Sequence, residues 1–305
     1  MEVPDQPFNR ETIQKYNVQQ KIKAGGVVVK DILEQYDTDE IVIGFTGGKD
    51  STLTAYLVKK VCEENGWEKP DFMLIDHGQH FDEVEEFIDT IAEDWGFDVR
   101  IARNDDVIDQ AEEVNDTIPK EELNQRNQKA LEEVDKDEVP FLLDTEAGNH
   151  LLKTVAMKQL IENDGIKAVI NGVRWDEHDS RADENFYSPR EEPEHLRVHP
   201  ILQFSERDVW EAFWQVVVPK TSEYEWQGEY PENEEDLQGL SKKDLPINPK
   251  YFSGFRSLGS ETSTEKSCDT PAWLQNVENT VEREGRAQNK DDDAVMSRLR
   301  KLGYC

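Results

Sequence analysis

Cysteine is scarce in this sequence of 305 residues, with only Cys62, Cys268 and Cys305. The three are far apart and form no C-x-x-C pair, so neither a disulfide framework nor a cysteine-ligated zinc or iron–sulfur site is indicated. No apolar run approaches the roughly 18 residues of a membrane span, and residues 1–5 lack the features of a secretory signal peptide. We therefore expect a cytoplasmic protein without a membrane partner.

Basic residues are also in the minority. The 35 lysines and arginines stand against 67 aspartates and glutamates, which gives a formal net charge of −32. The acidic residues are spread along most of the chain, so the protein should repel nucleic acid, and we expect no nucleic-acid partner. Because concentrated salt would screen this self-repulsion, we expect a halophilic source.

Short apolar runs alternate with helical patterns along the first two thirds of the chain. The expected buried strands are residues 41–45, 72–75, 98–101 and 167–170, and the expected helices are residues 50–65, 82–95 and 149–163. Strands that alternate with helices are typical of an α/β fold with a doubly wound, mostly parallel sheet covered on both faces.

The most informative motif lies where the first strand ends. Two glycines, Gly47 and Gly48, permit close backbone approach and are followed at once by a helix, whose free amide groups can bind an anion. Lys49 adds a point charge for phosphate oxygens. Thr46 and Ser51 add hydroxyl groups. A Walker A loop is excluded, because it needs Ser or Thr after the lysine and here Asp50 follows.

This motif, Thr46-Gly47-Gly48-Lys49-Asp50-Ser51, resembles the SGGxDS loop of the PP-loop ATP pyrophosphatases, with Thr in place of the first Ser. The resemblance implies an adenine nucleotide α-hydrolase-like (Rossmann-like) fold and the cofactors ATP and Mg²⁺. It also implies cleavage of ATP between the α- and β-phosphates. The six loop residues are then predicted to bind the nucleotide, Lys49 as a catalytic residue as well. Asp50 makes sense as a helix cap or as the Mg²⁺ ligand.

Two further segments resemble the branch that contains phosphoadenylyl-sulfate reductases and the small subunit of sulfate adenylyltransferase. Residues 76–81 resemble its D-T-G-x-x-F segment, with His77 in place of Thr, and residues 172–181 resemble its G-x-R-x-D-E-x-x-x-R segment. The resemblance implies nucleotide contacts from Asp76 and Gly172. Arg174 and Arg181 are predicted catalytic residues, because two arginines can clamp a phosphate or sulfate. A structural ion pair with Asp176 or Glu177 is the alternative.

The resemblance continues towards the C-terminus. Residues 255–259 resemble the R-x-x-G segment of the same group, which implies that Arg256 contacts the nucleotide. Residues 282–288, with Gly303 and Tyr304, resemble the tail of the adenylyltransferase small subunit. Trp210, in a matching P-[IL]-x-x-[WF]-x-x-x-D-[VI]-W element, is expected in the core.

Three segments are expected. Residues 1–36 form an N-terminal helical segment with an interruption at Gly25-Gly26. Residues 37–217 form the PP-loop nucleotide-binding domain, with an acidic, peripheral and helical insertion at 105–147. Residues 218–305 form an insertion loop and a C-terminal extension that completes the site and shows little strand pattern.

The cysteines bear on the choice of reaction. The reductases attack sulfur with a thiol in an E-C-G-x-H motif, which is absent here; Cys268 is followed by Asp269, and Cys305 is the terminal residue. We therefore predict ATP-dependent adenylyl transfer to sulfate, in sulfate assimilation, with small-molecule substrates. The resemblance implies a separate GTPase partner subunit, and self-association is left open. The alternatives are a reductase with a C-terminal thiol, an adenylyltransferase of the FMN or thiolation type, and a regulatory ATP-binding subunit without turnover.

Overall fold

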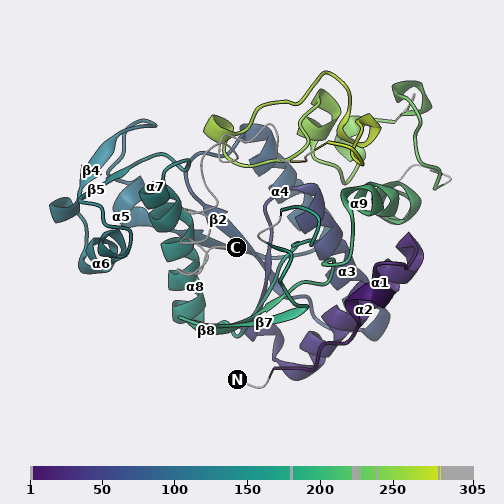
Figure 1. Ribbon diagram of the computed structural model, residues 1–305, viewed down its shortest axis with the longest axis horizontal. Helices are drawn as coiled ribbons and strands as arrows, with labels where there is room; N and C mark the ends of the chain where they lie inside the picture. Colours follow the sequence, from purple (N-terminus) through teal and green to yellow (C-terminus); the bar gives the residue numbers. More distant parts are fainter. Residues whose placement is uncertain are drawn as a thin grey trace.

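A six-stranded sheet forms the centre of the computed structural model, which describes residues 3–178, 181–221, 226, 228–237, 240–280 and 282. Five strands run parallel, and the sixth, β7, is an antiparallel edge strand. In spatial order the strands are β3 (Val99–Arg103), β2 (Asp71–Asp76), β1 (Ile41–Gly44), β6 (Ala168–Ile170), β8 (Glu194–Val198) and β7 (Tyr187–Glu191). The predicted α/β class with a mostly parallel sheet is confirmed (Figure 1).

Side chains alternate between the two faces of the sheet, and each face has its own helices. Ile41 and Ile43 pack in the large core with α2 (Val18–Gln35), α3 (Lys49–Asn65) and α4 (Asp82–Trp95). Val42 points the other way, into a smaller core formed with Met157 and the rest of α8 (Ala156–Asp164). This period-two alternation along β1 explains why its apolar run is continuous: both faces of the strand are buried.

The N-terminal helical segment breaks at a different place from the one predicted. The chain forms α1 (Arg10–Ile13) and then α2, which begins after a capping box at Asn17. The expected interruption at Gly25-Gly26 is wrong, because α2 runs through both glycines. A Cβ atom at Gly25 would lie 2.7 Å from the carbonyl oxygen of Pro200, so the glycine allows the helix to pack closely there.

The acidic insertion forms a lobe with a core of its own, at the left of Figure 1. Its elements are α5 (Asp105–Ile108), β4 (Thr117–Pro119), a 3-10 turn (Lys120–Glu122), α6 (Gln125–Glu133), β5 (Glu138–Pro140) and α7 (Glu146–Asn149). The lobe is thus only partly helical, because β4 and β5 pair as an antiparallel ladder that was not expected. Its core continues into a π-helical turn (His150–Val155) that leads directly into α8.

Helices and turns make up the described chain after β8. They are α9 (Glu206–Ala212), a π-helical turn (Phe213–Val217), α10 (Val218–Thr221) and 3-10 turns at Glu234–Leu237, Lys242–Asp244, Pro249–Ser253, Glu261–Ser263 and Ala272–Leu274. We call residues 245–280 and 282 the C-terminal segment; as expected, its described residues contain no strand. Trp273 anchors the segment in an aromatic cluster with Trp210 and Trp214, which places Trp210 in the core as predicted.

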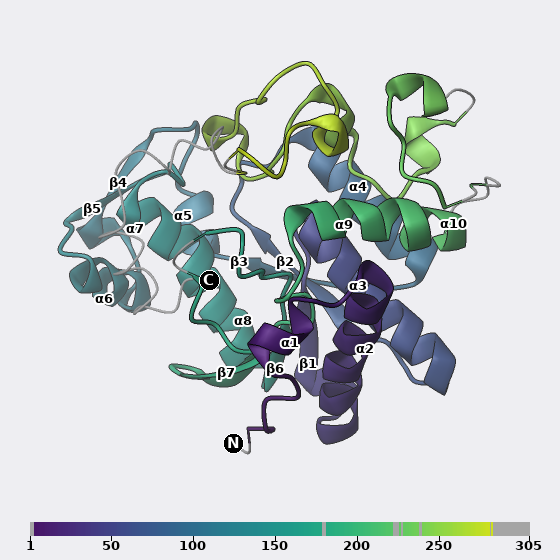
Figure 2. The same ribbon diagram turned by 45° about the vertical axis from the view of Figure 1, so that its right-hand side comes forward.

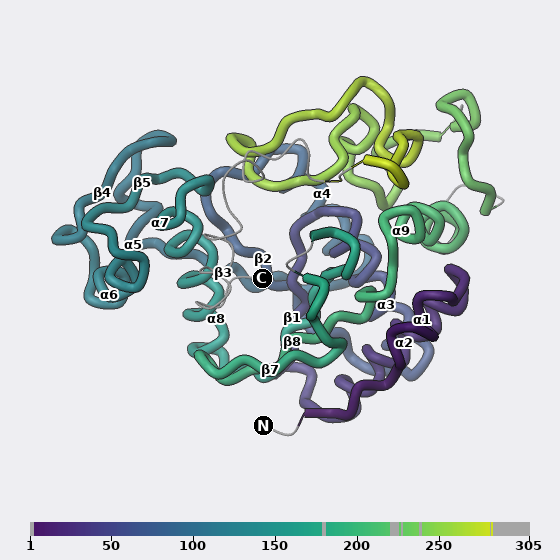
Figure 3. The backbone as a smooth tube through the Cα atoms, in the orientation of Figure 1, coloured from purple at the N-terminus to yellow at the C-terminus, as the bar shows by residue number. Residues whose placement is uncertain are grey.

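The C-terminal segment crosses above α4 and α9 in both ribbon views, at the yellow-green end of the colour bar (Figures 1 and 2). The backbone tube shows the same arrangement (Figure 3). The large core includes residues of α2, of the sheet and of this segment, so all three expected segments share one core. Within the described residues, no helix has the length and apolar character that a membrane span needs.

Candidate active site

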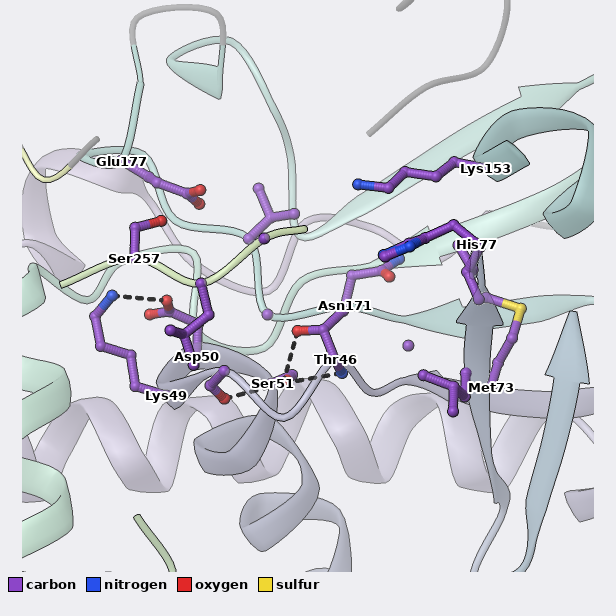
Figure 4. Close-up of a pocket in the computed structure, with 18 of the residues that line it drawn as sticks. Thr46, Lys49, Asp50, Ser51, Met73, His77, Lys153, Asn171, Glu177 and Ser257 are labelled. Carbon is purple, nitrogen blue, oxygen red and sulfur yellow. Dashed lines mark hydrogen bonds and ion pairs between the residues drawn. The ribbon is translucent and has the colours of Figure 1, made fainter. Parts of the chain in front are cut away.

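A pocket of about 240 Å³ lies at the carboxyl ends of β1, β2 and β6. Parallel α/β sheets bind ligands at this edge. The loop after β1, with Lys49 and Asp50, lies at one end of the pocket, and Met73 and His77 lie at the other (Figure 4). The fold therefore brings the predicted phosphate loop and the segment after β2 together around one cavity.

The phosphate loop is held by its own hydrogen bonds. The Ser51 hydroxyl donates to the carbonyl oxygen of Gly48 at 3.0 Å, so it accepts from the amide of Thr46 at 3.3 Å and from the Thr46 hydroxyl at 3.2 Å. Gly47 has a positive φ of 67°, and α3 begins at Lys49 directly after Gly48. Tyr251 reaches in from the C-terminal segment, and its hydroxyl accepts from the amide of Lys49 at 2.8 Å.

Lys49 is buried at the centre of the loop and is surrounded by acceptors. Its ammonium group lies 3.2 Å from the carboxylate of Asp50, donates to the carboxylate of Glu282, and donates to the carbonyl oxygen of Arg256 at 3.3 Å. Burial acts to lower the pKa of Lys49, but Asp50 and Glu282 outweigh it and raise the pKa well above its ordinary value. Lys49 is therefore a permanent cation.

Arg174 brings a second cation to the same place from the loop after β6. Its side chain is fully buried, and each of its three nitrogens faces a carboxylate. Nε lies 2.7 Å from Asp50, Nη1 lies 2.6 Å from Asp176, and Nη2 donates to Glu282. Burial opposes the charge, but these carboxylates raise the pKa of Arg174 well above its ordinary value.

Gly172 makes this meeting of loops possible. A Cβ atom at Gly172 would lie 2.7 Å from the backbone carbonyl of Asp50 and 2.9 Å from the amide nitrogen of Ser51. Any side chain would therefore push the loop after β6 away from the start of α3. Gly172 also lines the pocket, so the predicted nucleotide contact lies within its reach.

Asp50 is the predicted Mg²⁺ ligand, and its surroundings fit that role. Burial raises the pKa of Asp50, while Arg174 and Lys49 oppose the shift. Its Oδ1 atom is buried and has no hydrogen-bond partner among the residues that the structure describes, although Arg174 Nε is 2.7 Å away, because the N–H is not aimed at it. Mg²⁺ needs only one or two protein carboxylates when substrate phosphates supply further oxygen ligands. Asp50 could therefore hold Mg²⁺ together with ATP.

Arg181 lines the pocket and pairs there with Glu177. Both arginines thus form the ion pairs that the alternative interpretation expected, Arg174 with Asp176 and Arg181 with Glu177. Arg174 is not itself among the lining residues, but it contacts Asp50 and Glu282, which are, so its ion pair with Asp176 does not separate it from the phosphate loop.

Three predicted nucleotide contacts, Gly47, Asp76 and Arg256, lie outside the pocket lining. Asp76 forms an ion pair with Arg103 at 2.6 Å, and its other oxygen accepts from the amide of Gly78 at 2.8 Å. Arg256 is buried and holds Glu206 at 2.7 Å. Both side chains thus stabilise segments next to the pocket, and a direct nucleotide contact from either stays a prediction.

Comparison with known proteins decides the family. The phosphoadenosine phosphosulfate reductase domain matches residues 40–225, which is more than half of the chain. The chain belongs to this family. Within the family it is similar to sulfate adenylyltransferase subunit 2 of Mesorhizobium japonicum, with 26% identity over 86% of this chain and 90% of the relative. The subunit 2 of Citrobacter koseri is 24% identical, over 91% of this chain and 94% of the relative.

The fold is shared with a more distant protein. The FMN adenylyltransferase of Candida glabrata, solved with FMN and the ATP analogue AMPCPP, superposes with a TM-score of 0.52 at 14% identity. The match covers 96% of this chain and 87% of the other. This likeness supports the adenine nucleotide α-hydrolase-like fold, and the relatives within the family are enzymes.

The reductase-family site also contains residues to which the sequence assigned no role. Glu282 belongs to the tail motif without a predicted role of its own, yet it contacts both Lys49 and Arg174. Lys153, from the π-helical turn, lines the pocket across from the phosphate loop (Figure 4). The tail resemblance was a signal for Glu282, but no spacing rule places a residue against a loop more than 200 positions away. Residues 283–288, 303 and 304 of that tail lie outside the described residues.

Proposed function

We propose that this protein transfers the adenylyl group of ATP to sulfate, giving adenylyl sulfate and pyrophosphate in sulfate assimilation. One observation carries the proposal. Two buried cations from separate loops, Lys49 and Arg174, converge on a single anionic group, the carboxylate of Glu282. A site that holds one anion between two cations at this edge of the sheet is suited to phosphate groups. The similarity to subunit 2 of sulfate adenylyltransferases supports sulfate as the acceptor.

In the proposed reaction, an oxygen of sulfate attacks the α-phosphorus. The bond between that phosphorus and the oxygen bridging to the β-phosphate breaks, and pyrophosphate leaves with the bond electrons. Sulfate is already an oxyanion, so no protein nucleophile and no general base are needed. Lys49 and Arg174 hold the leaving pyrophosphate and neutralise its growing charge, while Arg181 lines the pocket and can bind sulfate. Mg²⁺, held by Asp50, would neutralise further phosphate charge.

The opposite end of the pocket suits the adenine base. Met73 and Leu74 of β2 and Met157 of α8 line it, so it offers an apolar surface to a flat ring. ATP would then lie along the carboxyl edge of the sheet, with adenine near β2 and its phosphates near Lys49.

A partner subunit is part of the proposal. The relatives are named as subunit 2 of sulfate adenylyltransferase. Adenylyl sulfate formation is unfavourable in the enzymes that this chain resembles, and a GTPase drives it there. We propose a GTPase partner for this chain too, in the cytoplasm.

Reduction of phosphoadenylyl sulfate is the second candidate, because the matching family takes its name from that reaction. Reduction needs a thiolate, and burial raises the pKa of Cys62 to about 11. Cys268 is exposed and is not among the residues that line the pocket. Cys305 lies outside the described residues. The described thiols therefore do not favour this candidate.

The reverse reaction offers the most practical test, because it runs downhill without a partner. Purified protein is given adenylyl sulfate, Mg²⁺ and pyrophosphate, and ATP is measured with luciferase. We expect ATP to form, and we expect no sulfite from phosphoadenylyl sulfate and thioredoxin and no FAD from FMN and ATP. A Lys59→Ala variant, changed at the surface of α3, should form as much ATP as the parent. Sulfite or FAD production without ATP synthesis would overturn the proposal.

A further inference from the structure

Glu282 spans the two cations of the site with its two oxygens. Oε1 accepts from Lys49 and Oε2 accepts from Arg174, and the residue is only 8% exposed. Burial opposes its charge, yet Arg174 and Lys49 hold the pKa of Glu282 well below its ordinary value, so it is a carboxylate at every physiological pH. Two oxygens of one anion, each on a different cation, are also how a phosphate group would lie here.

Among the described residues, the carboxylates of the cluster outnumber its cations. Lys49 and Arg174 contribute two positive charges, and three carboxylates already contact them: Asp50, Asp176 and Glu282. The phosphates of ATP would add several more negative charges within a few ångströms, in a buried site where repulsion is poorly screened. Release of one carboxylate would therefore favour the binding of phosphate.

Glu282 is the carboxylate most easily released. Asp50 is fixed in the first turn of α3, and Asp176 accepts from the amide of Glu206 at 2.8 Å. Glu282, in contrast, comes shortly after a turn at residues 277–280, of which 278–280 are exposed. That turn is held by Arg256, whose guanidinium donates to the carbonyl oxygens of Val277 and Thr280, both at 3.1 Å. The buried Trp273 anchor lies before the turn, so it does not depend on the position of Glu282.

We propose that Glu282 occupies the place of the pyrophosphate portion of ATP, and that it competes with ATP and with the product pyrophosphate for Lys49 and Arg174. The inference rests on the proposed function of this pocket as an ATP site. The cavity agrees with it: about 240 Å³ is smaller than the roughly 300–1,000 Å³ of typical small-molecule sites. Competition lowers the apparent affinity for both ligands, since only the fraction of molecules with Glu282 displaced can bind. When the carboxylate of Glu282 returns to Lys49 and Arg174 after the reaction, it thereby favours the release of pyrophosphate.

The test measures binding by calorimetry for three probes: pyrophosphate, AMPCPP with Mg²⁺, and AMP. The parent is compared with Glu282→Gln and with Glu278→Gln, which alters an exposed glutamate of the same turn. In Glu282→Gln the two cations keep Asp50 and Asp176, so no buried charge is left unpaired. We expect this variant to bind pyrophosphate and AMPCPP about tenfold tighter or more, because a charge-assisted contact no longer competes. AMP, which lacks the β- and γ-phosphates, should bind unchanged, and Glu278→Gln should match the parent for all three.

Glu282→Asp keeps the charge on a shorter side chain that cannot span both cations, so it should tighten pyrophosphate binding less than Glu282→Gln. Weaker or unchanged pyrophosphate binding in a folded Glu282→Gln variant would overturn the inference and make Glu282 a residue that positions the two cations. Equal tightening for AMP would overturn it too, because the effect would then not lie at the β- and γ-phosphates. A failure of the proposed function can be told apart from a failure of this inference. If the variants behave as expected but the protein forms no ATP from adenylyl sulfate and pyrophosphate, Glu282 still competes with the phosphates, and sulfate is not the acceptor. If neither pyrophosphate nor AMPCPP binds any variant, both fail.

Discussion

The phosphate loop and the C-terminal segment meet at Lys49, and they are built in opposite ways. The loop is one short stretch, Thr46–Ser51, fixed by a strand end, by hydrogen bonds among its own residues and by the start of α3. The C-terminal segment has no strand or long helix and reaches the loop through Tyr251, Arg256 and Glu282, about 200 or more positions away in sequence. Local structure thus positions Lys49, whereas most of the groups that contact it come from residues far away in the sequence.

This difference predicts that the two regions can be perturbed separately. A change in the loop should alter phosphate binding, whereas a change in the anchors of the C-terminal segment should alter stability. The expected effects follow, from the largest to the smallest.

Arg256→Met should destabilise the fold the most. It leaves Glu206, which is 3% exposed, without its guanidinium partner, and it frees the turn before Glu282. Breaking a buried ion pair by removing one partner costs about 3–5 kcal/mol. Arg126→Met is the matched control, because the Arg126–Glu162 pair is nearly half exposed and should contribute at most about 1 kcal/mol. Urea titrations measure both, and equal losses for the two variants would mean that Arg256 does not anchor the segment.

Lys49→Ala should leave the fold intact and weaken ATP binding. The lost contact is a charge-assisted one, of about 1.5–3 kcal/mol. Lys59→Ala, on the same helix but paired with Glu63 at the surface, should bind ATP like the parent. Calorimetry with AMPCPP reads out both variants. Unchanged affinity in Lys49→Ala would contradict the role assigned to the loop.

Salt should stabilise the whole molecule while acting little on the buried cluster. With 67 acidic against 35 basic residues, surface repulsion dominates in dilute buffer. Raising potassium chloride from about 0.1 M to 1 M shortens the screening length from about 10 Å to 3 Å. We expect the melting temperature to rise by a few degrees over this range and to keep rising beyond physiological ionic strength. A melting temperature that is highest in dilute buffer would refute the halophilic interpretation.

Removing the thiols should have the smallest effect. A variant with Cys62, Cys268 and Cys305 changed to serine is expected to keep its activity in the luciferase assay within a few-fold of the parent. Attack falls on phosphorus and needs no thiolate, and a serine at position 62 can keep the hydrogen bond that Cys62 donates to the carbonyl of Glu68. Arg174→Ala and Arg181→Ala should each cost far more. A folded cysteine-free variant without activity would favour the reductase.

The sequence was most informative where structure is local. The four predicted strands correspond to β1, β2, β3 and β6, and the helix predicted at 82–95 has the bounds of α4, because each is a short apolar run or a clear helical period. The β7–β8 hairpin was missed. Its strands contain Pro189, Arg190 and two glutamates, since the hairpin lies at the edge of the sheet and does not need a continuous apolar run.

The candidate site divides in the same way. Thr46, Lys49, Asp50 and Ser51 could be predicted from a strand–glycine–helix pattern, and they do line the pocket. The resemblance implied that the C-terminal extension completes the site, but its individual contacts with Lys49 could not be predicted, because long-range contacts leave no spacing in the sequence. Whether Asp76 and Arg256 reach a bound nucleotide stays a prediction, as do the domain boundaries.

The central claim is that this site splits ATP between its α- and β-phosphates, and labelled ATP tests it most directly. The protein is incubated with sulfate, Mg²⁺ and ATP labelled at either the α- or the γ-phosphate, in a single turnover at high enzyme concentration. We predict that the α-label appears in adenylyl sulfate and the γ-label in pyrophosphate, and that neither appears in Lys49→Ala. A γ-label in orthophosphate with the α-label left in ADP would contradict the account, because the bond between the β- and γ-phosphates would then have been the one cleaved.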